Sequence, residues 1–144
     1  MNKHLFIFES GVWEGAGEIF FSMAEDRLPF VMSWTILPAQ EEKIYFNQVI
    51  EVGDFTDKMH NNFCVFDVKE KEFIIELENH LVGRVGGKGV LNPLVLAWEF
   101  RNNDQGFEGF EIYERKNDGY TMRAEFTAGE GLRTYVKGSI SKIS

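Results

Sequence analysis

Histidine and cysteine, which often act as nucleophiles, bases or metal ligands, are few in this sequence. His4, His60 and His80 are the only histidines, and Cys64 is the only cysteine. The sequence contains no Cys-x-x-Cys pair, no Gly-x-Ser-x-Gly nucleophile context and no histidines at metal-ligand spacing. We therefore expect no metal site, an inert Cys64 buried in its apolar run, and a binding protein in preference to an enzyme.

Glutamates offer the general acid and base groups that an enzyme would need. Glu108 and Glu111 share the run 107–115, and Glu99 lies close to Arg101. Carboxylates spaced along the strands of an acidic protein usually point to solvent, so we expect these side chains on the outer surface. A pocket with a carboxylate of strongly perturbed pKa would indicate an enzyme instead.

The segment 83–89, Gly-Arg-Val-Gly-Gly-Lys-Gly, has the glycine content of a phosphate-binding loop. It lacks the Gly-Lys-Ser/Thr ending, and Pro93 and a β-type run follow it where a phosphate site needs a helix. We interpret the glycines from Gly86 to Gly89 as a hairpin turn.

Gln48 is the polar position that bears most directly on a binding site. It interrupts a face whose other members are Ile44, Phe46, Ile50 and Val52. A buried amide needs hydrogen-bond partners, which a backbone group, a water molecule or the polar group of a ligand can supply.

These residues belong to a succession of short β-type runs. Turn signals separate about ten of them at intervals of roughly 8–12 residues, the spacing typical of a sandwich or barrel. The runs are 11–23, 30–37, 44–52, 63–68, 73–79, 81–85, 94–101, 107–115, 120–127 and 132–140. Asp118-Gly119 is a strong hairpin signal, and we expect residues 2–9 to form a short helix that caps an open end.

The first run carries a specific signal for a barrel. Trp13, Gly15, Gly17, Ile19 and Phe21 share one face of it. Two glycines inside a strand indicate a sharp bend, or the close approach of a backbone or a ligand. Closing an antiparallel meander also removes its edge strands. Residues 1–144 are therefore predicted to form a single all-β domain, an up-and-down antiparallel β-barrel of about ten strands, in preference to a sandwich.

Composition narrows the partners and the compartment. The formal net charge of −8, with no cluster of Lys and Arg, disfavours nucleic acid and anionic membrane surfaces. No apolar run approaches the roughly 20 residues that span a bilayer. With one cysteine and no signal-peptide core near its start, the sequence predicts a cytoplasmic protein.

The triplet Gly11-Val12-Trp13 resembles the Gly-x-Trp signature of the calycins, the superfamily of lipocalins, fatty-acid-binding proteins and avidins. The longer pattern, with Gly15 and Gly17, is similar to the first strand of nitrobindin-type barrels, which are intracellular and ten-stranded. That resemblance implies a carboxyl-terminal histidine that holds ferric haem. No histidine follows His80, so haem is disfavoured and no cofactor is expected.

Arg133 and Tyr135 are similar to the Arg-x-Tyr pair with which fatty-acid-binding proteins hold a carboxylate inside the barrel. A guanidinium can bind a carboxylate through two hydrogen bonds while a phenol donates a third. Leu132, Val136 and Ile140 occupy the opposite face of the same run, so the pair points inward only if a bulge reverses the strand.

The function that the sequence predicts is binding of a small hydrophobic or amphipathic molecule inside a calycin-type barrel. The alternative is a barrel with a filled interior that acts as a scaffold for a protein partner or a homodimer. The residues expected to line the site or orient the ligand are Trp13, Met32, Trp34, Phe46, Gln48, Arg84, Trp98, Tyr113, Arg133 and Tyr135.

Overall fold

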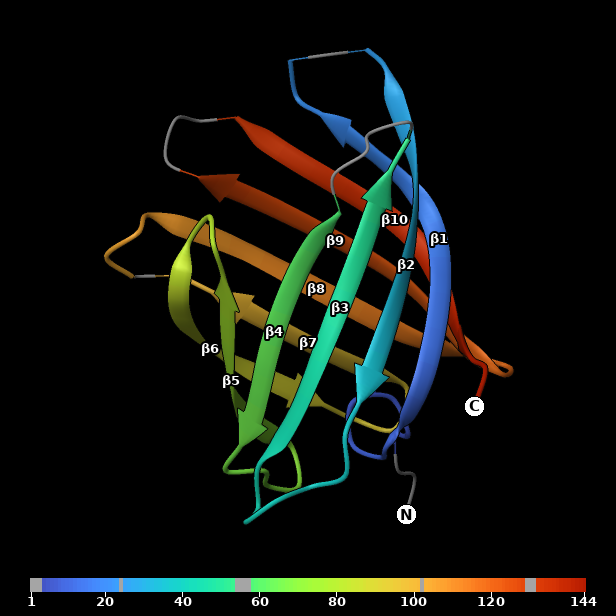
Figure 1. Ribbon diagram of the computed structural model, residues 1–144, viewed down its shortest axis with the longest axis vertical. Helices are drawn as coiled ribbons and strands as arrows, with labels where there is room; N and C mark the ends of the chain where they lie inside the picture. Colours follow the sequence, from blue (N-terminus) through green and yellow to red (C-terminus); the bar gives the residue numbers. More distant parts are fainter. Residues whose placement is uncertain (1–3, 24, 54–57, 102, 129–131) are drawn as a thin grey trace.

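Ten β-strands follow one another along the chain and close into a barrel (Figure 1). The computed structural model describes residues 4–23, 25–53, 58–101, 103–128 and 132–144. The strands are β1 (Gly11–Phe21), β2 (Arg27–Ile36), β3 (Ile44–Val52), β4 (Met59–Phe66), β5 (Glu72–Asn79), β6 (Gly83–Leu91), β7 (Val95–Phe100), β8 (Phe107–Lys116), β9 (Gly119–Ala128) and β10 (Arg133–Lys142).

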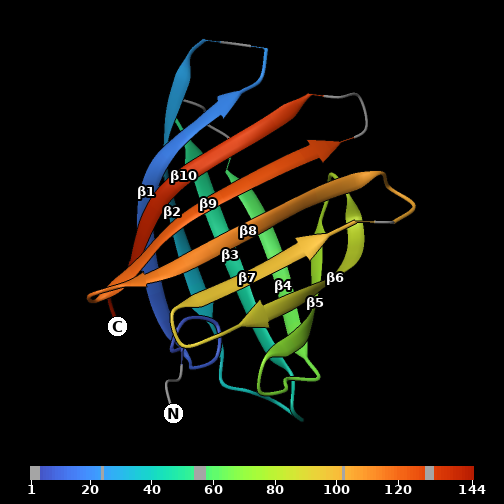
Figure 2. The same cartoon turned by 180° about the vertical axis from the view of Figure 1, so that it is seen from behind.

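Each strand pairs antiparallel with its neighbours in sequence, and β1 closes the ring on β10. We call the end where β1 begins the lower end and the end where β1 finishes the upper end; both chain termini are drawn near the lower end (Figure 1). Strands β2–β4 cross in front of β7–β9 in Figure 1, and the view from behind in Figure 2 brings β7–β10 forward. The predicted all-β barrel is confirmed.

Gly15 and Gly17 allow β1 to lie close against β10. A Cβ atom on Gly17 would lie 2.0 Å from the carbonyl oxygen of Lys137, and one on Gly15 would lie 2.3 Å from that of Ser139. No side chain fits at such distances. The expectation of a closely approaching backbone is therefore confirmed, with β10 as the backbone concerned.

The glycine-rich segment expected to be a hairpin turn is instead part of β6. A Cβ atom on Gly89 would lie 2.0 Å from Cζ of Phe73, and one on Gly87 would lie 2.1 Å from the carbonyl oxygen of Glu99. The ring of Phe73 on β5 thus covers Gly89, and β7 approaches Gly87. Contacts with neighbouring strands explain these glycines, so the turn prediction was wrong.

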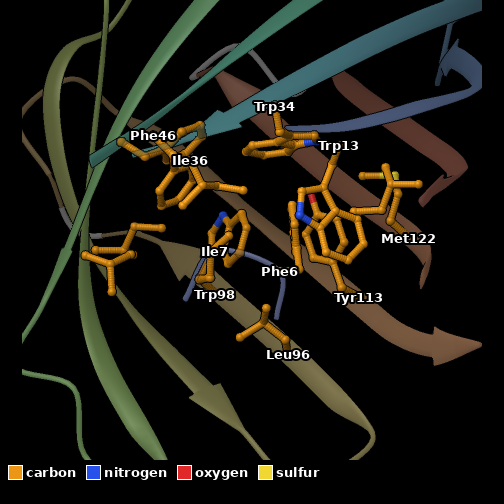
Figure 3. Close-up of a cluster of buried hydrophobic side chains, with 14 of the residues drawn as sticks. Phe6, Ile7, Trp13, Trp34, Ile36, Phe46, Leu96, Trp98, Tyr113 and Met122 are labelled. Atoms are coloured by element: carbon orange, nitrogen blue, oxygen red, sulfur yellow. The ribbon is translucent and has the colours of Figure 1, made fainter. Parts of the chain in front are cut away.

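The segment before β1 closes the lower end, although not as a helix. Within the described part of the predicted 2–9 helix, Phe8 and Glu9 donate backbone hydrogen bonds to the carbonyl oxygen of Leu5 and form turns. Phe6 and Ile7 have no exposed surface. Figure 3 shows both side chains among those contributed by the strands.

The described residues contain no helix of sufficient length and apolarity to cross a membrane.

Candidate functional site

The interior of the barrel is filled with aromatic rings around its lower half. The sequence-predicted residues Trp13, Met32, Trp34, Phe46, Trp98 and Tyr113 are all buried there. The ring of Trp34 lies 6.4 Å from that of Trp98 and 6.3 Å from that of Tyr113, measured between centroids, so rings from β2, β7 and β8 meet across the barrel (Figure 3). These side chains point inward as expected; a ligand contact for them stays a prediction.

The upper end of the barrel carries apolar side chains that are only partly buried. We call its apolar, half-buried side chains that pack onto the core the upper mouth; they are Ile19, Ile50, Val52, Val82, Phe107, Phe126 and Val136. Phe107 and Phe126 stack with their centroids 5.7 Å apart and their planes at 16°. Solvent therefore reaches apolar surface on the side chains that β1, β3, β8, β9 and β10 bring to this end.

A row of amides runs along one wall below the upper mouth. Asn61 Nδ2 donates to Gln48 Oε1 at 2.9 Å, and Asn79 Nδ2 donates to Asn61 Oδ1 at 2.9 Å. Asn79 Oδ1 in turn accepts the backbone N–H groups of Leu81 and Val82. We call Gln48, Asn61 and Asn79 the amide row. It supplies the donor that the buried carbonyl oxygen of Gln48 requires.

The free end of the amide row is the amide nitrogen of Gln48. Among the described residues its hydrogen-bond acceptor is the sulfur of Met32, at 3.5 Å. A thioether is a weak acceptor, so this N–H group keeps most of its capacity to donate to a stronger one. Gln48 is only 5 % exposed, so an acceptor oxygen atom beside its Nε2 would replace a hydrogen bond that water cannot easily supply there.

Glu111 stands on the opposite wall. It lies on β8, five strands from β3 in the ring of ten. Its Oε2 accepts from Trp98 Nε1 at 3.0 Å and its Oε1 accepts from the hydroxyl of Tyr113 at 2.7 Å. Burial raises the pKa of Glu111 to about 7, although both hydrogen bonds favour the ionised form. Burial and the charge of Glu111 hold the pKa of Tyr113 well above its usual value.

The expectation that Glu111 faces solvent is therefore wrong. Glu111 lies an even number of residues from Phe107 and from Tyr113, so it shares their inward face of β8, and this spacing could have placed it inside. Asn61 was missed as a site residue because two adjacent asparagines are typical of a loop, whereas β4 already begins at Met59 and includes Asn61.

Three predicted ligand-orienting residues lie on the outer face. Arg84 pairs with Glu78 at 3.0 Å, and Arg133 lies 3.5 Å from Glu125, both as exposed ion pairs. Tyr135 stacks on the outward ring of Phe20, 5.1 Å away. β10 pairs with β9 in continuous register from Arg133 to Ser141, so no bulge turns the Arg133–Tyr135 pair inward. Their predicted role inside the barrel was wrong.

Among the described residues, no three His, Cys, Asp or Glu side chains gather to hold a metal ion. Cys64 is half-buried instead of buried, and desolvation raises the pKa of its thiol, which disfavours the reactive thiolate. His60 and His80 are exposed, whereas His4 is buried at the lower end.

Comparison with known proteins bears on the fold. No protein-family model and no curated protein matches the chain. Among solved structures, an S-type phycobiliprotein lyase from Guillardia theta superimposes with a TM-score of 0.68 at 10 % identity, over 94 % of this chain and 89 % of that one. Likeness at this identity shows a shared barrel fold. Membership of the calycin superfamily stays a prediction.

Proposed function

We propose that the protein binds a small amphipathic molecule through the upper mouth, with its apolar part against the mouth and its polar groups toward the interior. The observation that carries this proposal is the position of half-exposed, inward-facing apolar side chains above buried polar groups. Water-accessible apolar surface at the upper end is stabilised by covering it, at roughly 25 cal/mol per Å².

Phe107 and Phe126 are the best apolar contacts for such a ligand. They stack on each other at the upper ends of β8 and β9 and are only half-buried, so a conjugated or cyclic molecule that extends this stack would suit the site. The mixture of a few polar groups with a mainly apolar lining is typical of small-molecule sites in barrels.

The two polar walls favour a ligand with both kinds of hydrogen-bonding group. Gln48 Nε2 favours an acceptor such as a carbonyl oxygen or a carboxylate. A carboxylate can accept more than the two hydrogen bonds that Glu111 now receives, so Glu111 favours an N–H donor. The fold shared with a phycobiliprotein lyase makes a bilin, which carries pyrrole N–H groups, carbonyls and carboxylates, the first candidate to test.

Binding is proposed in preference to catalysis. The feature that favours an enzyme is the perturbed pKa of Glu111, but both of its oxygen atoms are engaged by Trp98 and Tyr113. Within the described residues no serine, cysteine, histidine or second carboxylate bonds to this group. Glu111 is thus better suited to hold a ligand N–H than to transfer a proton.

Titration with biliverdin, followed by its absorbance, tests the proposal. Phe126→Ala removes half of the inner stack, and we expect it to weaken binding by about tenfold or more. Phe20→Ala breaks a matched stack on the outer face, with Tyr135, and should leave affinity within about twofold. Equal losses in both variants, or no binding of biliverdin, haem, a fatty acid and an apolar fluorescent dye by the wild type, would refute a ligand at the upper mouth.

A further inference from the structure

Phe6 occupies a cage built from four other rings. Its ring centroid lies 5.2 Å from that of Trp13, 5.1 Å from that of Trp34, 4.9 Å from that of Tyr113 and 5.6 Å from that of Tyr120. We call Trp13, Trp34, Tyr113 and Tyr120 the aromatic cage. Its members come from β1, β2, β8 and β9, whereas Phe6 comes from the segment before β1 (Figure 3).

The aromatic cage contains two hydrogen-bond donors that Phe6 leaves unsatisfied. The indole Nε1 atoms of Trp13 and Trp34 are buried and have no acceptor among the described residues. The third tryptophan, Trp98, donates to Glu111, so the unpaired donors are confined to the rings that contact Phe6. Buried donors are nearly always paired in folded proteins, and the ring of Phe6 offers them no acceptor stronger than its π face.

The hydroxyl groups of the cage, in contrast, are satisfied. Tyr113 donates to Glu111, and the hydroxyl of Tyr120 lies 2.8 Å from His4 Nδ1. The cage is therefore matched to its occupant in shape but not in polarity. An occupant with the same ring and an added acceptor would satisfy what Phe6 does not.

The segment that carries Phe6 is held by side-chain contacts, among them the hydrogen bonds of His4 to Tyr120 and to the carbonyl oxygen of Asn92, and not by pairing with a strand. Ile7 adopts a φ of 63°, a left-handed conformation that a β-branched residue rarely takes. Phe8 and Glu9 hydrogen-bond only locally, to Leu5, and the described part of the segment belongs to no strand. Its withdrawal would break no hydrogen bond of the β-sheet.

We propose that the aromatic cage is a binding site that Phe6 occupies as an internal substitute, and that it accepts a planar aromatic molecule with a hydrogen-bond acceptor in or on its ring. In the space of the Phe6 side chain, a ring carbonyl would accept from both Trp13 and Trp34, and a ring nitrogen of the quinoline type would accept from one of them. The cage lies at the lower end of the barrel, so this proposal does not rest on binding at the upper mouth.

The tethered ring of Phe6 competes with any ligand for the aromatic cage. A covalently attached competitor acts at a high effective concentration, which lowers the apparent affinity of the wild type. Phe6→Ala removes the competitor and should increase the affinity for a suitable ligand by about tenfold or more. Phe73→Ala is the matched control, because Phe73 is buried like Phe6, at 1 % exposure, and its ring contacts that of Phe8 and not an indole.

The indole N–H signals in a ¹⁵N-labelled sample report occupancy directly, because the chain has three tryptophans. Quinoline and naphthalene are the probes, since they share a shape and differ in the ring nitrogen. In Phe6→Ala we expect quinoline to shift the Trp13 and Trp34 signals, to leave Trp98 unmoved, and to bind about tenfold or more tightly than naphthalene. In Phe73→Ala, which keeps Phe6 in the cage, the Trp13 and Trp34 signals should shift only at the higher quinoline concentrations that the wild type needs.

The wild type provides a second measurement that does not depend on the folding of the variant. Saturating quinoline should shift the same two indole signals and accelerate amide exchange at Phe8 and Glu9 as their turn opens. Equal binding of the two probes by Phe6→Ala without indole shifts would show a mere apolar cavity and overturn the proposal. If the variant does not fold, unchanged indole signals in the wild type up to the solubility of quinoline would overturn it too.

Discussion

Trp98 and Glu111 face each other across β7 and β8, and the indole nitrogen of Trp98 donates to the buried carboxyl of Glu111 at 3.0 Å. Glu111 is 6 % exposed and lies on the inward face of its strand. The arrangement keeps an ionisable group inside the aromatic interior, where burial opposes its charge. One consequence for stability can be measured through the pH dependence of unfolding.

The first prediction is a pH dependence that belongs to Glu111. Because its pKa rises from 4.5 to about 7 on folding, the stability that it contributes is full below pH 4.5 and is lost as the pH rises through about 7. At 1.36 kcal/mol per unit, the loss has an upper limit of about 3 kcal/mol. Urea denaturation of Glu111→Gln should therefore show a smaller fall in stability between about pH 5 and pH 8 than the wild type.

Glu108→Gln is the control for this measurement, because Glu108 is exposed on the same strand. It should retain the pH dependence of the wild type. Identical pH profiles for Glu111→Gln and the wild type would show that Glu111 does not resist ionisation in the folded state.

The second prediction concerns His4, which holds the segment before β1. Its Nε2 donates to the carbonyl oxygen of Asn92 at 2.5 Å and its Nδ1 lies by Tyr120. Burial, aided by the charge of Arg115, lowers the pKa of His4 from its usual 6.5, so its contribution is full above pH 6.5 and is lost as the pH falls toward the lowered value. Amide protection at Phe8 and Glu9, corrected for intrinsic exchange, should fall below pH 6.5.

His4→Gln should remove this pH dependence, whereas His80→Gln, at an exposed position, should keep it. Protection that stays constant across the same range in the wild type would argue against His4 as the group that titrates.

The third prediction tests the amide row. Asn61→Ala leaves Gln48 Oε1 and Asn79 Nδ2 without their partner, and we expect a loss of about 2 kcal/mol in the free energy of unfolding. Asn62→Ala, at the adjacent exposed position, should change it by less than about 0.5 kcal/mol. Chemical denaturation compares the two; equal effects would mean that the row contributes nothing beyond its place in β4.

The fourth prediction concerns the close contact of β1 with β10. A methyl group at Gly17 would meet the carbonyl oxygen of Lys137 at 2.0 Å, so Gly17→Ala should destabilise the barrel by about 2 kcal/mol or more. Gly86 has no atom within 4 Å of the same position, so Gly86→Ala should be neutral or up to about 1 kcal/mol more stable. Thermal melting of both variants gives the comparison, and a tolerated Gly17→Ala would contradict the contact.

Alternation along single strands accounts for what the sequence predicted correctly. The inward faces of β2 and β3, with Met32, Trp34, Phe46 and Gln48, followed from period-two patterns that need no knowledge of the neighbouring strands. The Asp118-Gly119 signal likewise located the connection between β8 and β9. Local patterns were thus sufficient for the architecture.

What the sequence missed depends on contacts between distant residues. Gly89 reads as a turn until Phe73 is seen to cover it, and Phe6 reads as part of a helix until the rings of Trp13 and Trp34 surround it. Glu111 was predicted to face solvent because it is charged, whereas its spacing from Tyr113 indicates the inward face. Arg133 was predicted as a ligand-orienting residue from a family resemblance, although the apolar face of β10 already indicated that it points away from the interior.

The most direct test of ligand binding inside the barrel is native mass spectrometry of the protein incubated with biliverdin. We expect one ligand bound to the 16.6 kDa chain, retained in Phe20→Ala and strongly reduced in Phe126→Ala at the same ligand concentration. A spectrum with only the bare chain at every ligand concentration, or a complex that survives equally in both variants, would contradict it.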